Sequence, residues 1–124
     1  MRHQIAGKKL GRSTGQRNAL RRTMINQFFE HERIRTTRAK AVAIRSEAEK
    51  LVTLAKQGIK AGDQKMVNAR RVAASRLGDA ESVKRLFDKI APRYEKTKGG
   101  FTRILRLGTR KGDAAEIVML EFVE

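Results

Sequence analysis

Cysteine is absent from this chain, and proline, tyrosine and histidine are scarce. Without cysteine the protein can form no disulfide and no thiolate metal site, which is typical of a reducing compartment. The two histidines, His3 and His31, fall in different expected elements, so we expect no metal or catalytic cluster around them. No stretch approaches the ~20 apolar residues of a membrane span, and no apolar leader opens the chain, so we expect neither.

Catalytic and phosphate-loop motifs are missing as well. No serine lies in a nucleophile-elbow context, and residues 7–11 match neither the dinucleotide-binding nor the P-loop pattern. Glu47 and Glu49 cannot face each other on one helix, and a surface ion pair with Arg45, four residues earlier, accounts for Glu49. The sequence therefore predicts no catalytic residue, no cofactor, no metal and no small-molecule substrate. We expect a protein that is not an enzyme.

Acidic residues are missing from the first 22 positions, while seven basic residues are present. These are Arg2, Lys8, Lys9, Arg12, Arg17, Arg21 and Arg22. Such a segment repels itself and has too few large apolar side chains to collapse in water, so a polyanion is needed to order it. We predict that residues 1–12 form an extended basic arm that binds nucleic acid.

The excess of positive charge extends over the whole chain. Its 124 residues include 29 Lys and Arg against 13 Asp and Glu, a net charge of +16. Because such a charge destabilises a compact monomer by self-repulsion, it indicates a polyanionic partner. The acidic residues of positions 113–124 are the exception, and we expect them on a strand that faces away from that partner.

Helical periodicity first appears after the arm. Ser13 and Gln16 have the spacing of a capping box, which predicts a helix that ends near Glu30 or His31. Its expected apolar positions are Leu20, Met24, Ile25, Phe28 and Phe29. A short β-prone link around Ile34 follows.

Three more helices are expected in the middle of the chain. The second is capped by Thr36 or Thr37 and closed by Gly58. The third is capped by Asp63 and stops at Gly78. Its expected apolar face consists of Met66, Val67, Ala73 and Leu77. The fourth starts at Asp79 or Ser82 and is ended by Pro92, with an apolar face of Val83, Leu86, Phe87 and Ile90.

The carboxyl-terminal part changes to strand-like composition. Residues 101–107 and 115–123 are rich in β-branched and aromatic residues, and the glycine-bounded segment 108–113 between them is turn-like. This pattern predicts an antiparallel hairpin that packs on the helices. We therefore predict an α+β fold: a single two-layer domain over residues 13–124, with about four helices packed on a small sheet that the Ile34 segment could extend.

Basic side chains crowd the starts of the first two helices, where they oppose the helix dipole. They are Lys8, Lys9, Arg12 and Arg17 at the first helix, and Arg38 and Lys40 at the second. Such an arrangement is suited to hold phosphates through side chains and free backbone N–H groups together. The alternative is a solvated basic surface.

Further basic residues continue this surface. Arg38, Arg45 and Lys56 line up beside the apolar stripe of the second helix, and Arg predominates over Lys in residues 1–45, which favours bidentate phosphate contacts. The hairpin and its loop add Arg103, Arg106, Arg110 and Lys111. For the two loop residues, nucleic-acid contact and simple solubility both stay open.

Charge alone does not separate RNA from DNA. No recognition helix in a dimer frame, aromatic RNP strand or GXXG loop is present. Basic arms that order on contact suit deeply folded RNA. A DNA-architectural protein and an accessory domain of an RNA-modifying enzyme stay as alternatives.

Five segments along the chain form a recognisable series. They are Met1-Arg2-His3 with residues 7–12, then residues 32–41, Leu86-Phe87 with 91–94, 99–106, and 110–113. The most specific is Gly99-Gly100-Phe101-Thr102-Arg103-Ile104-Leu105-Arg106. In this order and at this spacing they resemble the bacterial large-subunit ribosomal protein seventeen family from end to end. Phe101 stands where that family has Tyr more often.

The resemblance implies a structural constituent of the large ribosomal subunit. Such a protein would bind and stabilise folded large-subunit rRNA near the polypeptide exit side, beside neighbouring ribosomal proteins in the cytoplasm, without catalysis. It also implies helices against a small mixed sheet. The residues expected to thread into rRNA are Arg2, His3, Lys8, Lys9 and Arg12. Those expected to hold phosphates around the body are Arg17, Arg21, Arg22, Arg35, Arg38, Lys40 and Arg45, with Arg103, Arg106, Arg110 and Lys111 completing the predicted RNA-binding set.

Overall fold

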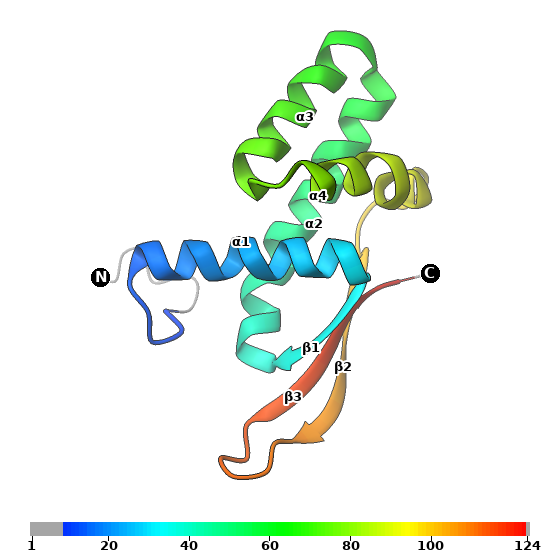
Figure 1. Cartoon of the computed structure of the whole chain (residues 1–124). Helices are drawn as coiled ribbons and strands as arrows, with labels where there is room; N and C mark the ends of the chain where they lie inside the picture. The colour runs from blue at the N-terminus through cyan, green and yellow to red at the C-terminus, as the bar shows by residue number, and fades with distance from the viewer. Residues whose placement is uncertain (1–8, 124) are drawn as a thin grey trace, which may run out of the picture.

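The computed structural model describes residues 9–123, which form one α+β domain (Figure 1). The elements in chain order are α1 (Thr14–His31), β1 (Arg33–Thr37), α2 (Arg38–Ala61), α3 (Asp63–Leu77), α4 (Ala80–Arg85), a π-helical turn (Leu86–Ile90), a 3-10 turn (Ala91–Tyr94), β2 (Thr102–Thr109) and β3 (Glu116–Phe122). Helices α1 and α2 cross beside the sheet, α3 lies at one end of the molecule, and the β2–β3 loop projects at the other. The predicted fold class is confirmed. Of the predicted arm, positions 1–8 lie outside the described residues.

Helix α1 begins as its sequence predicts. Ser13 Oγ accepts a hydrogen bond from the Gln16 N–H at 3.3 Å, and Gln16 Oε1 accepts one from the Ser13 N–H at 3.1 Å. This reciprocal pair satisfies two of the N–H groups that a helix start leaves without partners. The buried face of α1 consists of Met24, Ile25, Phe28 and Phe29, which confirms the predicted stripe.

Helix α2 runs past Gly58, where the sequence predicted its end. A Cβ at Gly58 would lie 2.6 Å from the Cβ of Ala69 on α3, so the missing side chain lets the two helices approach closely. The helix ends at Ala61, and Gly62 turns the chain into α3 with a φ of +68°. Asp63, the predicted cap of α3, is instead its first helical residue. The prediction that Gly58 closes α2 is therefore wrong.

Helix α3 buries less of its predicted apolar face than expected. Ala73 and Leu77 are buried, but Val67 is 48% exposed, and Ala69 takes its place against α2. The predicted stop at Gly78 is confirmed, since this residue adopts the left-handed conformation at the carboxyl end of the helix.

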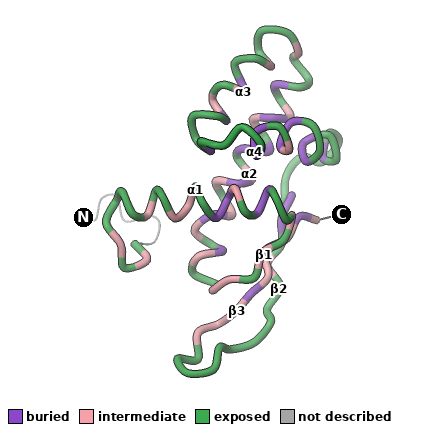
Figure 2. The backbone as a smooth tube through the Cα atoms, in the orientation of Figure 1, coloured by how far each residue is buried: buried purple, intermediate pink, exposed green. Residues whose placement is uncertain are grey.

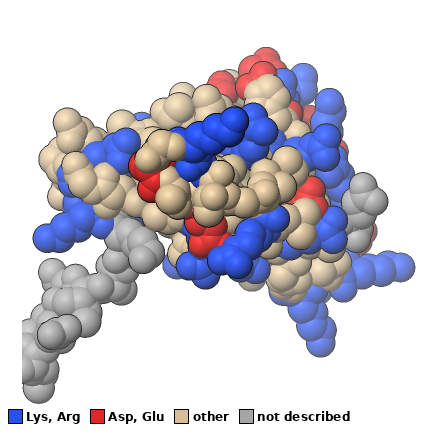
Figure 3. All heavy atoms as spheres, turned by 90° about the horizontal axis from the view of Figure 1, so that it is seen from below, with Lys and Arg blue, Asp and Glu red and all other residues tan. Residues whose placement is uncertain are grey.

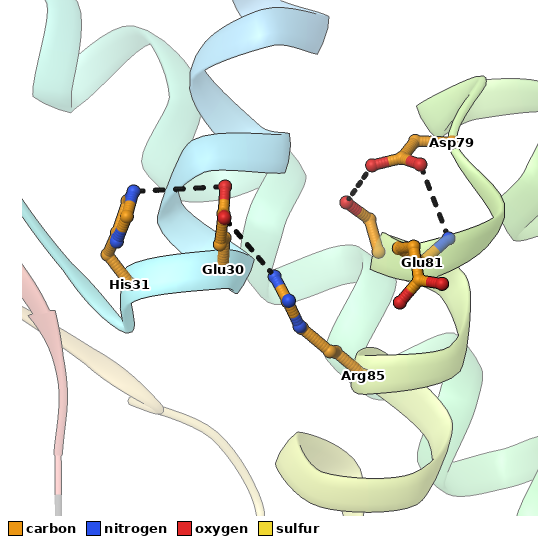
Figure 4. Close-up of polar contacts among 6 residues, drawn as sticks. Glu30, His31, Asp79, Glu81 and Arg85 are labelled. Atoms are coloured by element: carbon orange, nitrogen blue, oxygen red, sulfur yellow. Dashed lines mark hydrogen bonds and ion pairs between the residues drawn. The ribbon is translucent and has the colours of Figure 1, made fainter.

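Asp79 is the N-cap of α4, and its carboxylate accepts hydrogen bonds from the Glu81 N–H at 3.2 Å and from the Ser82 hydroxyl at 2.9 Å (Figure 4). Farther along α4, Arg85 Nη1 lies 4.0 Å from a carboxylate oxygen of Glu30, which links α4 to the end of α1. The predicted apolar face is buried. The helical segment passes through Pro92 as a 3-10 turn instead of ending there.

The sheet has the order β1-β3-β2 and is antiparallel at both pairings between described strands. The small mixed sheet that the resemblance implied is therefore wrong, whereas the predicted hairpin is confirmed. Strand β2 continues through Gly108, which had been expected in the turn, and a bulge between Arg106 and Gly108 accommodates Leu107.

The two faces of the sheet differ. Val118, Leu120 and Phe122 of β3 point into the core, where the Phe122 ring stacks on Phe28 of α1 with ring centroids 4.3 Å apart. The buried stretches follow α1, α2, the segment from α4 through the 3-10 turn, and β3, whereas nearly all of β2 and its loop is exposed (Figure 2). Because side chains alternate along a strand, the residues between these core positions form an outer face, on which Arg33, Arg35, Arg103 and Leu105 are exposed.

Candidate nucleic-acid interface

A groove of about 550 Å³ lies where β1 passes into α2, beside the end of the hairpin. It is lined by Arg35, Thr36, Thr37, Lys40, Leu107, Gly108, Thr109, Arg110 and Ile117. The structure thus brings together three of the sequence-predicted basic residues from β1, α2 and the hairpin loop. We call this the β1–α2 groove.

Two of its cations are uncompensated. Within residues 9–123, the side chains of Arg35 and Lys40 have no hydrogen-bond or ion-pair partner. Lys40 lies in the first turn of α2, and Thr37 occupies the N-cap position without making the predicted side-chain capping bond. The groove therefore presents two free positive charges at a helix end whose backbone N–H groups favour anions.

Three predicted arginines at α1 are held by backbone carbonyls. Arg12 donates to the Leu10 carbonyl at 2.6 Å, Arg17 donates to the Arg12 carbonyl at 2.7 Å, and Arg22 Nε donates to the Arg76 carbonyl at 3.1 Å. A carbonyl is a neutral partner, so each guanidinium is positioned but keeps its full charge and its remaining donors. Arginines held in this way are suited to phosphate contacts.

The predicted ridge on α2 is largely occupied by structural contacts. Arg45 Nε donates to the Thr102 hydroxyl at 3.3 Å, and Glu49 Oε1 accepts from the same hydroxyl at 2.8 Å. The structure therefore places Thr102 between these two residues, in place of the simple surface ion pair expected for them. Lys56 lies over the Phe101 ring, 4.8 Å from its centroid, and donates to the Thr97 carbonyl. These contacts fix the start of β2 on α2.

The hairpin arginines are paired with carboxylates. Arg103 Nε lies 2.6 Å from Glu121 Oε1, and Arg106 Nε lies 2.6 Å from Glu116 Oε1. The bond from Arg106 lowers the pKa of Glu116 and raises the pKa of the guanidinium. The acidic side chains of β3 thus compensate the basic side chains of β2, so these arginines offer less charge to a phosphate than the sequence indicates.

The β2–β3 loop repeats this pairing. Arg110 Nε donates to Asp113 Oδ1 at 3.0 Å, and this hydrogen bond is the main reason that the pKa of Asp113 falls to about 2. Lys111 is exposed beside it. Arg110 lines the β1–α2 groove, but its charge is largely neutralised there.

The remaining predicted residues are scattered over the surface. Arg38 is 63% exposed in its side chain and lies 4.0 Å from Glu116, Lys9 is exposed, and Arg21 Nε is buried without a hydrogen-bond partner. Arg2, His3 and Lys8 lie outside the described residues. Viewed from below, Lys and Arg side chains extend from much of the surface, with small groups of acidic atoms between them (Figure 3).

Sequence reasoning missed one exposed cation on the same strand as Arg35. Arg33 precedes Arg35 by two residues on β1, so both side chains lie on the outer face of the sheet. That two-residue spacing was the available signal, but the β1 segment is too short to assign as a strand from sequence alone. Within residues 9–123 no cluster of His, Asp and Glu could hold a metal ion, and no helix is long and apolar enough to cross a membrane.

In comparison with known proteins, the chain is similar to the members of one family. A family model described as Ribosomal protein L17 matches residues 20–123. A protein of Geobacter metallireducens called large ribosomal subunit protein bL17 is 49% identical over all 124 residues, which cover 66% of its own length. A protein of the same name in Pelobacter propionicus is 45% identical over the whole chain, which covers 92% of that relative. A third, in Thermoanaerobacter sp., is 45% identical over 94% of the chain and 97% of the relative.

The extent of the match differs among relatives. The chain spans just under two thirds of the length of the Geobacter metallireducens protein and of a Geotalea daltonii protein, at 66% and 65%, but more than nine tenths of the Pelobacter propionicus protein. The β1–α2 groove and the hairpin both fall inside the region that the family model matches.

Proposed function

This chain belongs to the ribosomal protein L17 family, and from that premise we propose that it is a structural constituent of the large ribosomal subunit that binds and stabilises folded rRNA. It acts by binding and not by catalysis, in the cytoplasm and as part of the translation machinery. Its partners are large-subunit rRNA and the large-subunit proteins that lie beside it.

The observation that carries this proposal is the distribution of compensated and uncompensated charge. Arg35 and Lys40 are unpaired in the β1–α2 groove, and Arg12, Arg17 and Arg22 are held by neutral carbonyls along α1. Cations without a carboxylate partner are those that gain most from a phosphate, because binding releases counterions without first breaking an ion pair. These five residues are the proposed RNA contacts of the described body.

The basic arm, residues 1–12, adds to this surface in the proposal. Its basic residues precede α1 in the sequence, and the first turn of α1 carries no acidic residue. The hairpin residues Arg103, Arg106 and Arg110 are weaker candidates, because their carboxylate partners would have to be displaced or left beside a phosphate.

Sedimentation with ribosomal subunits tests the proposed function. After a moderate salt wash, the chain should stay with the large subunit, since many simultaneous phosphate contacts and protein contacts hold it there. A control protein of similar size and charge that lacks this fold should be released. Release of the chain into a DNA-bound fraction would contradict the ribosomal role and favour the DNA-architectural alternative.

A further inference from the structure

The hairpin has a different electrostatic character from the rest of the protein. Residues 102–123 contain four basic and three acidic side chains, a net charge of +1 in a chain whose net charge is +16. Three of the four basic residues, Arg103, Arg106 and Arg110, each have a carboxylate within hydrogen-bond distance. The hairpin is therefore a nearly neutral element on a strongly basic protein.

The same element exposes large apolar side chains. Leu105 is 41% exposed and Leu107 is 49% exposed, on the strand that forms one edge of the sheet. Leu105 pairs with the half-buried Met119 across the strands, and Leu107 is the extra residue of the bulge, next to Gly108, which pairs with Ile117. The exposed apolar side chains thus follow one another along β2 and are backed by apolar residues of β3.

Charge changes across the outer face of the sheet. The opposite edge, β1, carries the unpaired Arg33 and Arg35, whereas on the β2 side Arg103 is bonded to Glu121. A partner with negative charge is thus favoured at β1. The β2 side instead offers exposed apolar side chains bordered by arginines that are paired with carboxylates. Apolar area within a satisfied polar rim is the composition of a protein–protein interface.

We propose that the β2 side of the hairpin, centred on Leu105 and Leu107, docks a neighbouring protein through an uncharged, apolar surface of that partner, while the β1 side faces RNA. This inference rests on the proposed function, because the partner is a protein of the same subunit. RNA is the poorer occupant, since phosphates would meet Glu116 and Glu121 and leave the two leucines without apolar contacts.

Site-specific photo-crosslinking in purified large subunits tests the inference. Leu105→p-benzoylphenylalanine and Leu107→p-benzoylphenylalanine place the probe in the proposed interface. Val67→p-benzoylphenylalanine is the matched control, because Val67 is 48% exposed on α3, far from the hairpin in the fold. All three side chains are exposed, so the substitutions should not disturb the core.

The expected result is a protein adduct that resists ribonuclease, at a yield about tenfold higher from positions 105 and 107 than from position 67. Peptide mapping should place both adducts on one large-subunit protein, on a segment poor in charged residues. Adducts sensitive to ribonuclease, or equal yields at all three positions, would overturn the inference while leaving the proposed function intact. Absence of the chain from the subunits, seen before irradiation, would overturn both.

Discussion

Replacing Gly58 by alanine separates two physical effects, helix propensity and steric overlap, that predict opposite changes in the stability of the protein. Alanine is favoured over glycine within a helix by about 1 kcal/mol, so helix propensity alone predicts a more stable protein. In the structure, however, the added Cβ would lie 2.6 Å from the Cβ of Ala69, well inside van der Waals contact. The obstructing atom is fixed to the backbone of α3 and cannot rotate away, so α2 and α3 must move apart.

The magnitude follows from these two terms. Overpacking costs about 1–3 kcal/mol, and the upper half of that range applies because no flexible side chain can yield. After the gain in propensity, Gly58→Ala should lower the free energy of unfolding by about 1–2 kcal/mol. For a chain of this length the melting temperature should then fall by roughly 4–8 °C.

Urea and thermal unfolding followed by circular dichroism measure the effect. Gly15→Ala is the matched control, since this glycine lies in α1 with no heavy atom within 4 Å of the added Cβ, and it should be neutral or slightly stabilising. The double variant Gly58→Ala with Ala69→Gly transfers the Cβ between the helices and should recover most of the loss. A stabilised Gly58→Ala protein, or a double variant no better than the single one, would refute the reasoning.

Three other changes to the protein have expected outcomes. Thr102→Val removes the hydroxyl that binds Glu49 and Arg45 while keeping the side-chain volume, so the free energy of unfolding should fall by about 1–2 kcal/mol in urea titrations. Unchanged stability would contradict a stabilising role for the Thr102 hydroxyl. Deleting residues 1–12 should leave the circular dichroism and melting temperature nearly intact while weakening rRNA binding, and an unfolded body would show that the arm is structural. The pKa of Asp113 is lowered to about 2, so its carboxyl group should titrate near that pH in NMR spectra, and its pKa should return toward 3.8 in Arg110→Gln. The pairing of Asp113 with Arg110 is complete above pH 4 and is lost as the pH falls through 2. Titration of Asp113 near 3.8 in the unaltered protein would show that the pair does not form.

The helices and the hairpin could be predicted from sequence because their signals are local. The capping box at Ser13 and the left-handed stop at Gly78 depend on a few neighbouring residues, and both are confirmed. Gly58 could not be read correctly, because its role depends on Ala69 of another helix. Periodicity places Val67 on the apolar face of α3, whereas the packing of α3 against Gly58 of α2 buries Ala69 instead.

The candidate site was predictable as a set of charges but not as a pattern of pairing. The sequence shows that Arg103, Arg106 and Arg35 are all basic, and nothing local distinguishes them. The register of the antiparallel pairs places both Arg33 and Arg103 opposite Glu121, and only Arg103 bonds to it, whereas Arg35 lies opposite Met119. Strand register is a property of the whole sheet, so the division into compensated and uncompensated cations required the fold.

The central claim is that uncompensated cations beside the β1–α2 groove, and not the paired arginines of the hairpin, contact rRNA. The most direct test compares the salt dependence of binding to large-subunit rRNA for two variants with the same loss of charge. Arg35→Gln with Lys40→Gln should reduce the slope of log affinity against log salt by about 1–2, because each phosphate contact contributes roughly 0.7–0.9. Arg103→Gln with Arg106→Gln should leave that slope nearly unchanged. Equal slopes for the two variants, or a flat salt response of the unaltered chain, would contradict the account.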